Sequence, residues 1–215
     1  MDEKTTDAGP GRIVIDLFTT LDGVAQAPGA PDEDTSDGFR FGGWQAGYPS
    51  PSMGEQVRQG METLDALLLG RRTYDIFASY WPHHTEGPDG DIGRLFDRVP
   101  KYVASRHPNL TLDWQGSARV GDDLASDIDA LRARHREAHV IGSIDFAHTL
   151  ISEGLFDELK LWVYPILLGR GKKVFVDDVT PSVLRLLAPP ETDEAGVMLL
   201  RYAPTGRTPE TGSFG

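Results

Sequence analysis

The sequence predicts an α/β protein whose central sheet is mostly parallel and ends with antiparallel strands. Short apolar runs that are typical of strands alternate with helical patterns along most of the chain, which is the order of strand–helix–strand crossovers. The last three strand-like runs follow one another directly, so we expect them to pair antiparallel. Together these observations indicate a mixed sheet with flanking helices.

The individual elements follow from the apolar pattern and the turn residues between them. The predicted strands cover Arg12–Phe18, Ala66–Leu69, Lys101–Ser105, His139–Ile141, Glu158–Pro165, Val183–Ala188 and Val197–Ala203. The predicted helices cover Ser52–Thr63, Thr73–Ser79, Asp91–Arg98, Asp123–Arg136 and Ile144–Glu153. The run Glu158–Pro165 is apolar on both faces, as is typical of a strand at the centre of a sheet or at an interface.

The length of 215 residues is enough for one domain with a full core. We expect this domain to cover residues 11–204. Residues 1–10 are polar and predict a disordered N-terminal tail, and residues 205–215 predict a loop-like C-terminal extension.

Composition limits the partners and the location. A formal net charge of −12 argues against nucleic acid and against an anionic membrane surface. The absence of cysteine excludes disulfides and thiolate chemistry, and the histidines lack metal-ligand spacing, so no metal is expected. No apolar run approaches the roughly 20 residues of a membrane span, and no secretory signal is recognised. We expect a cytoplasmic protein with a small-molecule partner.

The strand end at Leu69-Gly70-Arg71-Arg72-Thr73 is the first candidate site. A buried strand passes here into a helix, whose first N–H groups favour an anion, and the two arginines add positive charge. The segment is also consistent with an ordinary helix start followed by surface arginines.

Two further strand ends carry similar chemistry. Ser105-Arg106 follows an apolar strand, and a guanidinium suits a ribose 2′-phosphate. Gly142-Ser143 precedes the helix from Ile144, where serine can cap and a pyrophosphate can lie. Each segment alone is also consistent with a surface Ser-Arg pair or an ordinary helix cap, and for any single site a cap is the more frequent case. Ligands sit at the carboxyl ends of parallel strands, so the three ends together suggest one extended dinucleotide.

The segments around residues 20–23, 24–51 and 169–173 remain ambiguous. Asp22 follows the first strand and could orient or protonate a heterocycle, or belong to a common Asp-Gly turn. Gly169 and Gly171 permit close approach to a ligand or form a simple turn. Residues 24–51 form a long loop with several aromatic residues, which could wall a substrate or cover the core or a dimer partner.

The ordered motifs TTLDG, GGW, LLLGRRTYDIFASYW, KYVASR, VIGS and DELKLWVYPILLGRGKKVF resemble the bacterial dihydrofolate reductase-like family. That family includes the reductase domain of the bifunctional riboflavin-biosynthesis deaminase/reductase. The resemblance extends from about Gly11 to Phe214 and is nearest to stand-alone members. It implies a three-layer fold of the dihydrofolate reductase type, NADPH as hydride donor, and a homodimer, which the apolar strand Glu158–Pro165 also favours.

The resemblance also implies roles for particular residues. The cofactor would contact Gly70, Arg71, Arg72 and Thr73 at its phosphates, Ser105 and Arg106 at its 2′-phosphate, Gly142, Ser143 and Ile144 at its pyrophosphate, and the turn with Gly169 and Gly171. Asp22 would lie near the nicotinamide and take part in catalysis, and the substrate would contact Thr20, Trp44 and Trp81.

These observations lead to three functional hypotheses. The first is an NADPH-dependent reductase of a pterin, pyrimidine or flavin precursor, in which Asp22 or a water that it positions helps to supply the proton. The second is a nucleotide-binding sensor or partner module without catalysis. The third is a reductase that uses a flavin or deazaflavin carrier.

Overall fold

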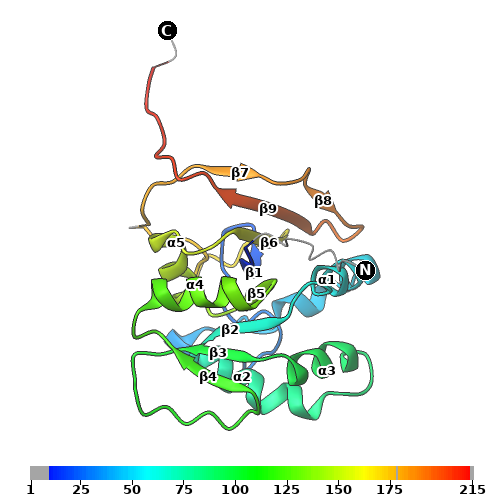
Figure 1. Ribbon diagram of the computed structural model, residues 1–215. Helices are drawn as coiled ribbons and strands as arrows, with labels where there is room; N and C mark the ends of the chain where they lie inside the picture. Colours follow the sequence, from blue (N-terminus) through cyan, green and yellow to red (C-terminus); the bar gives the residue numbers. More distant parts are fainter. Residues whose placement is uncertain (1–9, 178, 214–215) are drawn as a thin grey trace, which may run out of the picture.

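The computed structural model describes residues 10–177 and 179–213 (Figure 1). Its strands are β1 (Arg12–Thr20), β2 (Ala66–Gly70), β3 (Lys101–Ala104), β4 (Ser117–Val120), β5 (Glu137–Ile141), β6 (Glu158–Tyr164), β7 (Leu184–Leu186), β8 (Glu191–Thr192) and β9 (Met198–Pro204). Its α-helices are α1 (Pro51–Gly60), α2 (Arg71–Tyr80), α3 (Gly90–Arg98), α4 (Leu124–Arg134) and α5 (Ile144–Glu153), and the short 3₁₀ helices are η1 (Ser36–Gly38), η2 (Trp44–Gly47) and η3 (Trp81–His83).

Within the described residues the strands form one sheet in the order β4-β3-β2-β5-β1-β6-β9-β7, and β8 pairs with β9. In this order, each strand from β4 through β3, β2, β5 and β1 to β6 is parallel to its neighbour. Strand β9 pairs antiparallel with β6, β7 and β8. Buried side chains of α4 and α5 pack on one face of the sheet, and those of α2 and α3 pack on the other. The predicted mixed, three-layer α/β fold is therefore confirmed.

Strand alternation explains how the two faces are filled. Ile13, Ile15 and Leu17 of β1 point into the core beneath α4 and α5, while β2 sends Leu67 and Leu69 into the core beneath α2 and α3. A third cluster is formed where the loop after β1 covers aromatic residues of β6. Inner parallel strands are buried on both faces and therefore have continuous apolar sequences. The apolar run of β2 predicted a strand for this reason.

The structure corrects several predicted boundaries. Two short strands, β4 and β8, were not predicted, because each is a partly or fully exposed strand without an apolar alternation. Helix α2 begins at Arg71 rather than at Thr73, so both arginines lie in its first turn. Strand β5 begins two residues earlier than predicted, at Glu137, because its first residue is charged but buried.

The inner position of β6 has a consequence for the predicted dimer. β6 lies between β1 and β9, and all seven of its residues are buried within one chain. Its apolar faces therefore carry no argument for an interface, and the homodimer stays a prediction. No helix in the described part of the chain is long and apolar enough to cross a membrane.

The predicted terminal segments are only partly covered. Residues 1–9 of the predicted N-terminal tail lie outside the described residues, as do residues 214 and 215 of the C-terminal extension. Residues 205–213 contain no helix or strand and are mostly exposed, and their role as an extension stays a prediction.

Candidate functional site

The three strand ends selected from the sequence lie side by side. β3, β2 and β5 are consecutive and parallel in the sheet, so the segments after Ala104, Gly70 and Ile141 emerge at one edge. We call this the carboxyl edge; β1 and β6 end there as well, because they run parallel to β5. The expected grouping of these segments is thus a property of the fold.

Two hydrogen bonds connect the ends of β2 and β5. The Gly70 N–H donates to Ser143 Oγ at 2.9 Å, and the Ser143 N–H donates to Thr73 Oγ1 at 3.0 Å. The expectation that Ser143 caps α5 is wrong, because its hydroxyl serves the neighbouring strand end and makes no cap hydrogen bond. The two helix starts are instead fixed to each other.

Both helix starts keep N–H groups available. The N-cap residues of α2 and α5 make no side-chain cap hydrogen bond. Gly142 and Ser143 adopt the left-handed conformation, with φ of 65° and 58°, so the chain turns sharply before the half-buried Ile144 begins α5. Uncapped first-turn N–H groups beside a tight turn are suited to an oxyanion.

The two arginines of α2 have partners within the protein. Arg71 Nε donates to both carboxylate oxygens of Asp75 at 2.8 Å, and its Nη1 donates to the Thr111 carbonyl at 3.2 Å. Arg72 Nη1 donates to Asp34 Oδ2 at 3.3 Å, while more than half of the Arg72 side chain is exposed. Arg71 thus helps to hold the loop after β3, and Arg72 contacts the loop after β1.

Arg106 differs from these two arginines. It is exposed, and its guanidinium has no hydrogen bond or ion pair to any residue that the structure describes. Ser105 precedes it, and its Oγ accepts a hydrogen bond from the His107 N–H at 3.2 Å. A cavity of about 500 Å³ follows directly, lined by Arg71, His107, Pro108, Asn109, Leu110 and Thr111. The exposed guanidinium of Arg106 therefore lies next to the segment that lines this cavity, at the carboxyl edge.

Asp22 is held as a hydrogen-bond acceptor. Its carboxylate accepts from Thr20 Oγ1 at 2.6 Å, from the Gly169 N–H at 2.7 Å and from the Leu168 N–H at 3.3 Å. Burial opposes the charged form, but these hydrogen bonds outweigh it and lower the pKa of Asp22. An ionised carboxylate has no proton to give at neutral pH, so the geometry favours a positioning role over that of acid. Thr20 is buried and fixes the same turn.

The two glycines of the turn after β6 are needed for different reasons. Gly169 has a φ of 73°, and a Cβ there would meet open space. Gly171 has a φ of 123°, and a Cβ there would lie 2.7 Å from Val24 and 2.8 Å from Phe39. Packing against the loop after β1 explains Gly171 without a ligand, and a cofactor contact at either glycine stays a prediction.

The aromatic loop covers the sheet. Phe39 and Trp44 are buried, and both belong to the cluster around Trp162 and Tyr164 of β6. The Trp44 indole N–H donates to the Gln26 carbonyl at 2.9 Å, and its ring meets Tyr164 edge to face. The substrate role predicted for Trp44 is not supported, because this residue is part of the core; only Phe41 among the loop's large aromatics is exposed.

Trp81 also packs inside the protein. It lies in η3, at the far end of α2 from the carboxyl edge, and its ring meets Phe77 and Phe96 edge to face. Its indole nitrogen is buried without a partner among the described residues. Trp81 is partly buried, and the substrate role predicted for it stays a prediction that these contacts do not support.

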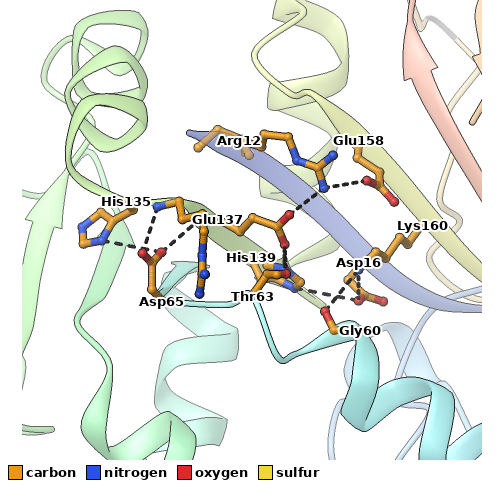
Figure 2. Close-up of polar contacts among 12 residues, drawn as sticks. Arg12, Asp16, Gly60, Thr63, Asp65, His135, Glu137, His139, Glu158 and Lys160 are labelled. Carbon is orange, nitrogen blue, oxygen red and sulfur yellow. Dashed lines mark hydrogen bonds and ion pairs between the residues drawn. The ribbon is translucent and has the colours of Figure 1, made fainter. Parts of the chain in front are cut away.

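A partly buried charged network was not predicted from the sequence (Figure 2). Arg12 Nη2 donates to Glu137 at 2.7 Å and to Glu158 at 2.9 Å, and Arg201 Nε donates to Glu158 at 2.6 Å. These contacts join the first residues of β1, β5 and β6 to one another and to Arg201 in β9. Charged or polar residues two positions apart at the starts of β5 and β6 are the signal that could have revealed them.

The same network continues to Asp16, His139 and Lys160. His139 Nε2 lies 3.2 Å from Glu137 Oε2, and Asp16 Oδ1 accepts from the Trp162 indole at 2.8 Å. Asp16 Oδ2 lies 3.9 Å from both His139 Nδ1 and Lys160 Nζ, as Figure 2 shows. The three groups approach one another at the register that pairs Asp16 with Lys160.

The fold is that of a dihydrofolate reductase-like domain. Residues 12–196 match the family of the RibD C-terminal domain, and the chain belongs to that family. The predicted family relationship is thereby confirmed.

Individual relatives support this assignment. The uncharacterized protein YyaP of Bacillus subtilis (strain 168) is 28% identical over 195 residues, which cover 89% of this chain and 94% of YyaP. A Shewanella sp. PV-4 protein, provisionally named for riboflavin biosynthesis, has a TM-score of 0.66 at 22% identity and covers 90% of this chain and 99% of its own. Dihydrofolate reductase from Enterococcus faecalis, solved with NADP(H) and RAB-propyl, has a TM-score of 0.56 at 15% identity and covers 91% and 98%. At these identities the two structures show a shared fold.

Proposed function

We propose that this protein is an NADPH-dependent reductase that transfers hydride to a C=N or C=O carbon of a small heterocycle of the pterin, pyrimidine or flavin-precursor type. The observation that carries the proposal is the juxtaposition of the β3, β2 and β5 ends, with two uncapped helix starts and the uncommitted Arg106. Membership of the RibD C-terminal domain family supports an oxidoreductase.

The residues at the carboxyl edge fit the phosphates of a dinucleotide. The first N–H groups of α2 and α5 would receive the pyrophosphate, since oxyanions are stabilised at helix N-termini. Arg106 would hold the 2′-phosphate, and the cavity beside it has room for part of the adenosine. NADPH would supply the hydride, and the E. faecalis relative was solved with that cofactor.

The turn that contains Asp22 would order the other end of the site. Asp22 fixes Leu168 and Gly169 through its carboxylate, and it thereby sets the path of the β6–β7 loop next to the end of β1. Its place in the mechanism is to position this loop or a water.

The proposal is tested by calorimetric titration with NADPH, followed by NADPH oxidation assays on a panel of pterins, ribityl-pyrimidines and flavin precursors. Binding of NADPH with oxidation on at least one compound class is the expected result. Binding without turnover on any compound would favour a nucleotide-binding module instead. Turnover only with a reduced flavin or deazaflavin would show that this carrier, and not NADPH, is the hydride donor.

A further inference from the structure

Two cations from distant segments meet at one carboxylate oxygen. Lys172 Nζ donates to Asp34 Oδ2 at 2.6 Å, and Arg72 Nη1 donates to the same oxygen at 3.3 Å. Arg72 follows β2, whereas Lys172 follows β6, and the ends of β5 and β1 lie between those strands in the sheet. The Asp34 carboxylate therefore connects the segment after β2 with the segment after β6 at the carboxyl edge.

Further hydrogen bonds orient the Asp34 carboxylate toward the two cations. Its other oxygen, Oδ1, accepts from the Ser36 hydroxyl at 2.6 Å and from the Ser36 N–H at 3.1 Å. The Gln26 amide donates to the Asp34 carbonyl at 3.1 Å, and Gln26 Oε1 accepts from the Lys172 N–H at 2.9 Å. Burial opposes the charged form of Asp34, but the contacts with Lys172 and Ser36 outweigh it and lower its pKa to about 2. The carboxylate is thus a fixed negative charge at neutral pH.

Of the two cations, Arg72 is the more accessible. The exposed fraction of its side chain is 59%, against 20% for Lys172 and 14% for Asp34. Beside Lys172 lies a cavity of about 250 Å³ whose lining includes Arg170 and Asp37, and Arg170 has no ion pair within the described ranges. Local positive charge and open space therefore adjoin the Asp34 carboxylate in a protein with a net charge of −12.

We propose that Arg72 and Lys172 form a subsite for a phosphate group, and that Asp34 is the internal anion which this phosphate displaces. Carboxylate and phosphate oxygens make the same charge-assisted hydrogen bonds to guanidinium and ammonium groups, and a diphosphate brings more negative charge than one carboxylate. The inference deepens the proposed function and rests on it, because NADPH is the ligand expected to bring the phosphate.

The test is a calorimetric titration of the full chain with NADPH, using Asp34→Asn, which keeps the shape and removes the charge. We expect NADPH to bind Asp34→Asn about fivefold to thirtyfold more tightly than the wild type, because one competing charge-assisted contact is gone. Asp32→Asn is the matched control, since Asp32 is exposed in the same loop and contacts neither cation; its affinity should stay at the wild-type value. Equal or weaker binding by Asp34→Asn would overturn the role of Asp34.

The subsite is tested separately with Lys172→Gln and Arg72→Gln in the Asp34→Asn background. Each is expected to weaken NADPH about tenfold or more, and unchanged affinity in both would overturn the subsite. Circular dichroism and thermal melts of every variant establish that the fold is retained. Failure of the wild type and all variants to bind NADPH would count against the proposed function. Titration with tripolyphosphate then decides the subsite: tighter binding by Asp34→Asn than by Asp32→Asn supports it, and equal binding overturns it.

Discussion

Thr73 and Ser143 lie 70 residues apart and are joined by a hydrogen bond of 3.0 Å from the Ser143 N–H to Thr73 Oγ1. Because Gly70 also donates to Ser143 Oγ, the starts of α2 and α5 form one rigid unit. The substitution Thr73→Val keeps the shape but removes the acceptor, leaving a partly buried N–H unsatisfied. It should lower the free energy of unfolding by about 1–2 kcal/mol in urea titrations. Ser79→Ala, on the exposed face of the same helix, is the control and should change it little. Equal stability of both variants would contradict a coupling between the helix starts.

Arg106 provides the sharpest test of cofactor preference. Since its guanidinium has no partner in the described part of the chain, Arg106→Ala should leave the melting temperature unchanged. Loss of one charge-assisted contact should weaken NADPH by about 1.5–3 kcal/mol, or roughly tenfold to a hundredfold. NADH lacks the 2′-phosphate and should be unaffected. Arg134→Ala, an exposed arginine at the end of α4, is the matched control. An equal loss for NADPH and NADH would remove Arg106 from this role.

Substitution of Asp22 should change the free energy of unfolding and kcat, but not the shape of the pH profile of turnover. Asp22→Asn replaces an acceptor of three hydrogen bonds and should destabilise the protein by about 1–2 kcal/mol at pH 7. The pKa of Asp22 is lowered in the folded state, so its stabilising effect is present at neutral pH and is lost as the pH falls through that pKa. The pH profile of turnover should keep its shape in Asp22→Asn, while kcat falls. Disappearance of an acidic limb from that profile would restore Asp22 as the proton donor.

Glu137 connects the buried network to acid stability. Burial alone would raise its pKa, but hydrogen bonds with His139 and Thr63 and the charge of Arg12 lower it from 4.5 to about 2. A carboxyl with a lowered folded pKa binds fewer protons when folded, so its contribution is complete above pH 4.5 and is lost towards pH 2. This shift corresponds to a contribution on the order of 3 kcal/mol.

Glu137→Gln should therefore be much less stable than the wild type at pH 7, and the difference should narrow as the pH falls below about 4.5. Urea unfolding at a series of pH values measures both curves. Glu62→Gln is the control, because Glu62 is exposed and directly precedes Thr63, which donates a hydrogen bond to Glu137. A gap that stays constant with pH would show that the network does not depend on the charge of Glu137.

The two glycines after β6 offer a matched pair. Gly171→Ala forces a Cβ against Val24 and Phe39 in addition to a positive φ, whereas Gly169→Ala brings only the backbone strain. We expect a loss of about 1–2 kcal/mol for Gly169→Ala and a loss larger by about 1–3 kcal/mol for Gly171→Ala. Thermal or urea unfolding measures both, and the reverse order would contradict the packing of the loop after β1 on this turn.

Local sequence patterns predicted most helices and strands, but they did not predict contacts between residues far apart in the chain. Helix α5 is found with the predicted ends, because its apolar spacing is regular and Gly154 follows with a left-handed conformation. Strand β4 was missed because an exposed edge strand is held by backbone pairing with β3 and needs no apolar pattern. The partners of Ser143 and Asp34 depend on contacts across 73 and 138 residues, and no local pattern encodes them.

The position of β1 has a consequence for synthesis of the chain. β1 leaves the ribosome first among the strands, yet its two neighbours are β5 and β6, and its Arg12 pairs with residues 125 and 146 positions later. Until those segments have been translated, the apolar side chains of β1 have no sheet to join. Such long-range pairing slows folding, so β1 stays without its sheet partners until β5 and β6 have been translated, and its apolar side chains are open to aggregation during that time.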